Sequence, residues 1–304
     1  MPLPDSLWRI RSASWTMAWL WLKSFCSQAL WRLNMRNAGG LMPGSLAEIV
    51  ENKKSELSER MRRRELDSIR LRVAKANHEF AAALNQPGVN LICELKPKSP
   101  SAGVLREQVN VDEIINCYSR HARAISVLTD AKYFGGSLEL LSSVNSKSQL
   151  PTLCKDFVIT PYQCFEARES GASAVLLIVK ILSDAQLRSL YQCITSLGMD
   201  AVVEVQTAEE VQRALRVKPT IMMINNRDLG TFQMDLSTTE RLAASIPAGT
   251  ILISASGILA RADIERLLPY CSNFLIGSAL MKSDNMDALL SEFVSLQPKA
   301  GVVS

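Results

Sequence analysis

The sequence predicts an α/β protein, because short apolar runs alternate with amphipathic helical patterns along most of its 304 residues. Eight such runs recur, helical patterns separate them, and polar side chains gather directly after many of them. The runs are Val89–Leu95, Ala124–Thr129, Thr152–Cys154, Ala174–Val179, Ala201–Val205, Ile221–Ile224, Thr250–Ser254 and Asn273–Ile276. Eight strand–helix repeats predict a (β/α)8 TIM barrel with extra N-terminal helices.

A doubly wound open sheet is the alternative, since it would give a similar number of repeats. Open sheets that bind nucleotides carry a GxGxxG or a Walker A loop, and the sequence contains neither. The barrel is therefore the stronger prediction.

Residues 1–44 differ from the remainder, and we expect them to form an N-terminal extension outside the barrel domain of residues 45–304. They hold five basic residues against Asp5 alone, so the net charge of +4 lies entirely in this segment. They also contain every tryptophan, namely Trp8, Trp15, Trp19, Trp21 and Trp31. Three interpretations stay open: a start assigned too far upstream, an organellar targeting peptide, and a helix that lies on a membrane surface.

Helical punctuation supports the repeat pattern. Two helices are expected before the first strand, over Leu46–Arg63 and Leu66–Leu84. Thr207 and Glu210 have the spacing of a capping box, and Pro161 suits the first turn of another helix. Residues 45–304 are electrically neutral as a whole, which argues against a nucleic-acid surface.

The cysteine and histidine counts bear on redox state and metals. Seven cysteines without a CxxC pair read as buried thiols in a reducing compartment, and we expect the cytoplasm. His78 and His121 are the only histidines, so a histidine-based metal site is not predicted.

The segment ICELKPKSPSAG, at the end of the first apolar run, is the most informative part of the chain. Glu94 and Lys96 are two residues apart on a strand, so both side chains point to the same face. At the carboxyl end of a barrel strand that face looks into the catalytic cleft. A simple ion pair at a strand end is the alternative that spacing alone leaves open.

Polar residues follow most of the other strands as well. They include Lys132 and Phe134, Lys155 and Asp156, Glu204, Asn225 and Arg227, Ser254 to Gly257, and Gly277 with Ser278. The last two groups follow neighbouring strands, where backbone N–H groups of a barrel commonly hold phosphate. A phosphorylated ligand is therefore expected.

These stretches resemble the indole-3-glycerol phosphate synthase family of tryptophan biosynthesis. The matching segments are ELKPKSPSAGVLRE, AISVLTDAKYFGGSLELL, LPTLCKDFVITPYQCFEARESGASAVLLI, GMDAVVEV, INNRDLGTFQMDLSTTERLA, SASGI and FLIGSALM. They extend over about residues 45–293 in the same order. The resemblance implies a carboxy-lyase that closes the indole ring of 1-(2-carboxyphenylamino)-1-deoxyribulose 5-phosphate, losing CO2 and water without metal or cofactor.

The resemblance also implies roles for individual residues. Lys132 is the expected general acid with Glu204 as its partner, and Glu94 with Lys96 is the expected second acid–base pair. The expected substrate-binding residues are Ser99, Phe134, Asn225, Arg227, Ser256, Gly257, Gly277 and Ser278. Arg227 suits the anthranilate carboxylate as a planar fork, and the glycines suit phosphate.

One position departs from the family pattern, since the family writes the seventh strand as SESGI and this chain has SASGI. Ala255 therefore replaces an active-site carboxylate. An active synthase is still the leading hypothesis. A degenerate barrel that binds a phosphorylated ligand with little turnover is the second, and another phosphate-binding barrel of the pathway, such as an isomerase, is the third. No second barrel is expected in these residues, no membrane contact is expected for the barrel, and other tryptophan-pathway enzymes are candidate partners.

Overall fold

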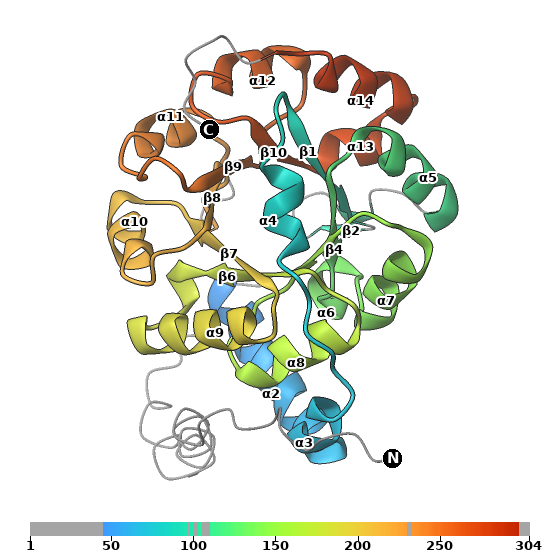
Figure 1. Cartoon of the computed structure of the whole chain (residues 1–304), viewed down its shortest axis with the longest axis vertical. Coiled ribbons are helices and arrows are strands. Elements are labelled where there is room, and N and C mark those ends of the chain that lie inside the picture. The colour runs from blue at the N-terminus through green and yellow to red at the C-terminus, as the bar shows by residue number, and fades with distance from the viewer. Residues whose placement is uncertain (1–44, 97, 100–102, 105–109, 230–232, 298–304) are drawn as a thin grey trace, which may run out of the picture. The chain divides into compact units, whose positions relative to one another are not determined.

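The computed structural model describes residues 45–96, 98–99, 103–104, 110–229 and 233–297. The predicted N-terminal extension lies outside these residues, so its separation from the barrel stays a prediction. Figure 1 shows the strands arranged in a ring with helices around it.

Eight parallel strands close into a barrel in the order β1-β10-β9-β8-β7-β6-β5-β4, which confirms the predicted fold. They are β1 (Asn90–Leu95), β4 (Ala124–Leu128), β5 (Thr152–Lys155), β6 (Ala174–Ile178), β7 (Asp200–Val205), β8 (Ile221–Asn225), β9 (Ile251–Ala255) and β10 (Asn273–Ile276). A small antiparallel pair, β2 (Lys98–Ser99) and β3 (Gly103–Val104), lies in the loop after β1.

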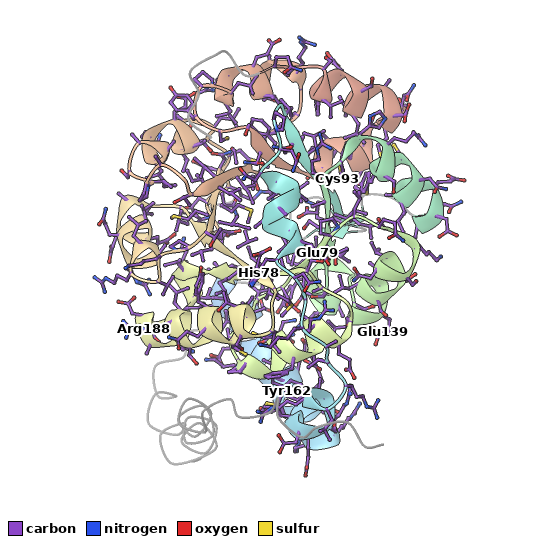
Figure 2. The ribbon with its side chains drawn as sticks, in the orientation of Figure 1. His78, Glu79, Cys93, Glu139, Tyr162 and Arg188 are labelled. Carbon is purple, nitrogen blue, oxygen red and sulfur yellow. The ribbon has the colours of Figure 1, made fainter. Side chains whose placement is uncertain are left out.

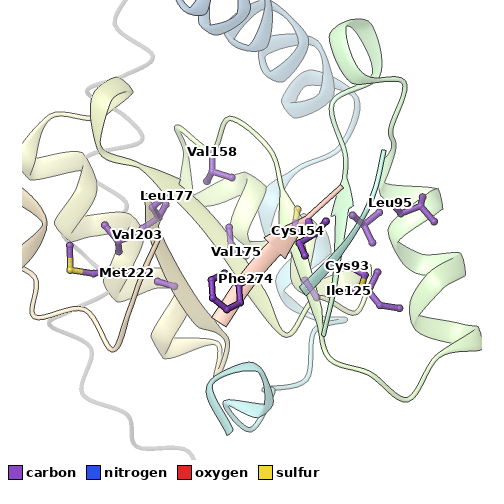
Figure 3. Packing of buried hydrophobic residues seen from close by; sticks show 14 of the residues in the cluster. Cys93, Leu95, Ile125, Cys154, Val158, Val175, Leu177, Val203, Met222 and Phe274 are labelled. Carbon is purple, nitrogen blue, oxygen red and sulfur yellow. The ribbon is translucent and has the colours of Figure 1, made fainter. Parts of the chain in front are cut away.

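Strand side chains alternate between two apolar clusters, as a pleated strand with both faces buried requires. Val202 and Met223 belong to the cluster inside the barrel. Their neighbours Val203 and Met222 belong to the cluster between the strands and the outer helices. Figure 3 shows part of this outer cluster, with Leu177, Val203 and Met222 close together.

The helices that cover the barrel follow the predicted punctuation. In chain order they are α2 (Leu46–Arg63), α3 (Leu66–Arg70), α4 (Glu79–Leu84), α5 (Val111–His121), α6 (Ala131–Phe134), α7 (Leu138–Lys147), α8 (Pro161–Glu169), α9 (Asp184–Ser196), α10 (Ala208–Leu215), α11 (Ser237–Ala243), α12 (Arg261–Leu267), α13 (Ser278–Lys282) and α14 (Met286–Val294). Thr207 caps α10 by accepting from the Glu210 backbone N–H at 3.2 Å. Among the described residues, no helix is long and apolar enough to cross a membrane.

The single helix predicted over Leu66–Leu84 was wrong, because α3 and α4 are separated by an extended segment. Two long-range hydrogen bonds hold this segment straight. The backbone N–H groups of Ala76 and His78 donate to the Leu197 and Gly198 carbonyl oxygens, each at 2.9 Å. His78 then takes a left-handed conformation with φ of 53°, which starts α4 in a new direction.

Helix α4 covers the amino-terminal end of the barrel (Figure 1). Phe80 and Leu84 bury their side chains in the inner cluster. The inward-facing Asp200 of β7 accepts from His78 Nδ1 at 2.9 Å and from the Ala81 N–H at 2.8 Å. Figure 2 shows His78 over the middle of the ring of strands. Helix α4 is therefore a plug for this end of the barrel. Hydrogen bonds to Asp200 fix its position, and its apolar face fills the barrel interior.

Helix α2 is tied to the barrel from a different side. Arg60 pairs with Glu166 of α8, and Arg64 donates to Glu169 Oε2 at 2.6 Å. The Tyr162 hydroxyl donates to the Arg64 carbonyl at 3.1 Å. The beginning of α2 extends to the carboxyl ends of the strands, where its side chains line a cavity.

Candidate active site

A cavity opens at the carboxyl ends of the strands, where TIM-barrel enzymes carry their active sites. Strand parity places a ring of side chains on its floor. In several strands the last inward-facing residue is two positions after an inner-cluster residue, as Glu94 is after Ile92 and Lys155 after Leu153. The polar and small members of this ring are Glu94, Lys155, Glu204, Asn225 and Ala255, and all of them line the cavity.

Glu94 is the centre of a buried ion-pair network. Its Oε1 lies 2.9 Å from Lys96 Nζ and its Oε2 lies 3.1 Å from Lys155 Nζ. Burial by itself would raise the pKa of the Glu94 carboxyl, but Lys155 and Lys96 outweigh burial and lower that pKa to about 2. Glu94 is therefore an anion at neutral pH, between two ammonium groups.

Glu204 has the opposite electrostatic character. Asn225 Nδ2 donates to Glu204 Oε1 at 3.1 Å, and the Arg227 N–H donates to Asn225 Oδ1 at 3.0 Å. Burial raises the pKa of the Glu204 carboxyl, and Lys155 with Asn225 only partly offsets this. Two carboxylates with pKa values moved apart are the usual arrangement when one group exchanges protons and the other supplies charge.

Lys155 pairs with Glu94 and also feels the charge of Glu204. Burial lowers the pKa of its ammonium group, but the charges of Glu94 and Glu204 reverse that change and raise the pKa. Lys155 therefore carries a proton at neutral pH, deep in a cavity from which that proton can be given to a substrate oxygen.

One side of the cavity suits phosphate. Lys96 Nζ donates to Ser278 Oγ at 3.2 Å, where β10 passes into α13. Ser256 and Gly257, after β9, both have positive φ, of 67° and 82°. A side chain at Gly277 would place its Cβ 2.5 Å from Glu94 Oε1, so only glycine fits there. A hydroxyl and an ammonium thus meet at a glycine-containing rim, which suits an anion.

The opposite side of the cavity is apolar. The rings of Phe134 and Phe157 lie 6.0 Å apart between centroids, tilted by 38°. Leu46 and Ile49 of α2 continue this surface. Such a wall accommodates a flat aromatic ring.

The structure brings together most of the predicted site residues. Those that line the cavity are Glu94, Lys96, Phe134, Glu204, Asn225, Arg227, Ser256, Gly257, Gly277 and Ser278. Ser99 belongs to β2, but its side chain is outside the described part of the chain.

Lys132 does not line the cavity. Its side chain is exposed, and Nζ donates to Asn52 Oδ1 of α2 at 2.9 Å. Lys155 does line the cavity, and strand parity could have placed it there, because it continues the inward positions of the run that ends at Cys154. Phe157 was also missed, since its aromatic contact with Phe134 comes from a different loop.

The profile of the family described as indole-3-glycerol phosphate synthase matches residues 46–293. The chain belongs to this family. The family predicted from the sequence motifs is therefore confirmed. The match covers all eight strands and the α2 helix that lines the cavity.

Individual relatives agree with this assignment. The chain is 39% identical over 254 residues to the indole-3-glycerol phosphate synthase of Lachnospira eligens, covering 81% of this chain and 95% of that protein. It is 44% identical over 204 residues to the synthase of Polynucleobacter asymbioticus, covering 66% and 76%. It is 39% identical over 249 residues to the tryptophan biosynthesis protein TrpCF of Vibrio cholerae, of which it spans about half, 53%.

Solved structures support the fold alone. The 3-hexulose-6-phosphate synthase of Salmonella typhimurium superposes with a TM-score of 0.56 at 10% identity, over 68% of this chain and 97% of that one.

Proposed function

We propose that this chain is an indole-3-glycerol phosphate synthase of tryptophan biosynthesis, a lyase acting on 1-(2-carboxyphenylamino)-1-deoxyribulose 5-phosphate. The observation that carries the proposal is the position of Lys155, which lines the cavity, pairs with Glu94 and feels the charge of Glu204. The apolar wall suits the anthranilate ring, and the rim at Gly277 and Ser278 suits the phosphate. A substrate with these two ends would place its carbonyl above the floor.

The first chemical step forms the new ring. The ring carbon that bears the carboxylate attacks the carbonyl carbon, and the carbonyl oxygen takes a proton from Lys155. CO2 then leaves from the same ring carbon and its bonding electrons restore the aromatic ring. Lys155 takes the role that the sequence resemblance gave to Lys132, because its ammonium lines the cavity beside Glu94 whereas Lys132 does not line the cavity.

The second step removes water. The new hydroxyl leaves with a proton, and a proton from carbon is lost so that the indole double bond can form. Burial raises the pKa of the Glu204 carboxyl, which makes this group the better candidate of the two carboxyls for exchanging a proton with the leaving hydroxyl. The Glu94 anion, held by Lys96, balances the cationic intermediate, and Glu204, once it has given its proton to the leaving hydroxyl, accepts the carbon-bound proton.

The degenerate barrel is the second candidate, and Ala255 is the observation in its favour. The cavity nevertheless keeps an ammonium, an ionised carboxylate and a carboxylate of raised pKa. We therefore favour turnover over simple ligand binding. The cytoplasmic location and contacts with other pathway enzymes remain predictions, which cell fractionation and co-purification would test.

Indole formation from the purified substrate tests the proposal. We expect turnover by the wild type and a fall in kcat of at least about 1,000-fold in Lys155→Met, with a smaller change in KM. Lys132→Met should retain most of the activity, and Lys54→Met, which removes an exposed lysine of α2, is the matched control. Absence of turnover in the wild type would refute the function. Loss of kcat in Lys132→Met with retention in Lys155→Met would refute the assignment of the acid.

A further inference from the structure

Lys53 is a buried lysine in the apolar stripe of α2. The buried residues of this helix are Ile49, Lys53 and Leu57, which are spaced four residues apart and so share one face. The Lys53 side chain is 1% exposed. An ammonium group in such a position is costly unless charged partners surround it.

Three carboxylates surround the ammonium of Lys53, and two of them are buried. Nζ lies 2.9 Å from Asp130 Oδ2 and 2.9 Å from Asp156 Oδ1, with Glu56 Oε2 at 3.2 Å. Asp130 is 0% exposed and Asp156 is 7% exposed. The three elements that meet here are α2, the turn after β4 and the turn after β5.

Both aspartates also hold backbone that forms the apolar wall of the cavity. Asp130 Oδ1 accepts from the Tyr133 N–H at 2.8 Å, which caps the short helix that carries Phe134. Asp156 Oδ1 accepts from the Phe157 N–H at 2.7 Å. Lys53 Nζ therefore contacts one carboxylate oxygen of Asp130 and one of Asp156. Through these two aspartates it connects the turns that carry Phe134 and Phe157.

The same helix supplies the rest of that wall. Ile49 lies one turn before Lys53, and it lines the cavity. Two further hydrogen bonds join α6 to α2. Tyr133 Oη donates to Glu48 Oε1 at 3.1 Å, and Lys132 Nζ donates to Asn52 Oδ1. These contacts lie outside the cavity, whereas Lys53 is beneath its wall.

We propose that Lys53 is a positioning residue that sets the aromatic-ring subsite of the cavity by holding Ile49, Phe134 and Phe157 in one wall. The inference rests on the proposed function for the identity of the ring. Lys155 has its own support in the β5 register with Leu128 and in its pair with Glu94. Loss of Lys53 should therefore weaken binding of the ring more than it slows the chemistry.

The test is Lys53→Met, with Lys54→Met as the control. Lys54 is the next residue on the same helix and pairs only at the surface with Glu51, at 2.5 Å. We expect KM for the substrate to rise about tenfold while kcat changes less than about threefold. Binding of anthranilate should weaken about tenfold, and binding of inorganic phosphate should change less than about twofold. The control should match the wild type in all four quantities.

A triple variant guards against misfolding. Lys53→Met with Asp130→Asn and Asp156→Asn leaves no buried charge unpaired and keeps amide oxygens as backbone acceptors, so it should fold if the single variant does not. The same pattern is expected in it. A folded variant with a lower melting temperature but unchanged KM and anthranilate affinity would overturn the proposal, as would equal losses of anthranilate and phosphate binding. Because both ligands are fragments, this comparison remains decisive even if the wild type shows no turnover.

Discussion

Replacing Gly277 by alanine tests whether the Glu94 carboxylate must stay where the structure places it. The added Cβ would lie 2.5 Å from Glu94 Oε1, 3.0 Å from its Cβ and 3.1 Å from its Cδ. Ordinary contact begins near 3.4 Å, so the carboxylate must move by about 0.9 Å. The backbone at Gly277 has φ of −133° and ψ of −61°, so it is not in the left-handed region.

The movement should be costly in two ways. Glu94 is 4% exposed and packed, so forcing extra volume against it should lower the free energy of unfolding by about 1–3 kcal/mol. A catalytic group displaced by about 1 Å loses on the order of 100-fold in rate, and we expect that fall in kcat/KM. Steady-state indole formation and urea unfolding measure the two effects.

A double-mutant cycle with Glu94→Ala isolates the clash. In the Glu94→Ala background the contacts with Oε1 and Cδ are absent and only the 3.0 Å contact with Cβ remains, so the stability cost should be clearly smaller than in the wild type. An equal stability cost in both backgrounds, or kcat/KM within threefold of the wild type in Gly277→Ala, would refute the reasoning.

Two further predictions concern charge in the cavity. Ala255 pairs in register with Asn225 of the neighbouring strand. Ala255→Glu should raise kcat/KM by up to about 100-fold if the new carboxylate restores one charge-assisted hydrogen bond there. Unchanged or lower activity would show that the chain has compensated elsewhere. On folding, the pKa of Glu94 falls from an ordinary 4.5 to about 2. The ionised carboxylate therefore contributes about 3 kcal/mol to the free energy of unfolding. This contribution is fully present above about pH 4.5 and is lost as the pH falls through about 2. Unfolding free energies between pH 5 and pH 2.5 should therefore fall less in Glu94→Gln than in the wild type, and parallel pH profiles would contradict this.

Local sequence signals were sufficient for the barrel frame. Each apolar run became a strand with ends within about one residue of the prediction, because a strand buried on both faces needs an unbroken apolar run and a turn at its end. The helix predicted over Leu66–Leu84 failed for the opposite reason. Its residues suit a helix, and what straightens the chain at Ala76 is hydrogen bonding to Leu197, far along the sequence.

The candidate site shows the same division. Glu94, Glu204 and Asn225 were predicted because they end strands, whose pleat fixes where their side chains point. Lys132 is on the short helix α6 after its strand, and there its side chain contacts Asn52 of α2. The pairing of Lys53 with Asp130 and Asp156 could not be predicted, because no local sequence pattern indicates which turns a buried lysine contacts.

The plug at the amino-terminal end of the barrel has a consequence for folding order. His78 and Ala81 are held by Asp200, which lies 122 and 119 residues later in the chain. Helix α4 is therefore synthesised long before Asp200, and its apolar face stays uncovered while β1 to β7 are synthesised. Closing so long a loop costs chain entropy, and the contacts between α4 and the barrel can offset that cost only after the loop has closed. We expect the amino-terminal cover to be among the last parts of the barrel to gain protection from hydrogen exchange during refolding.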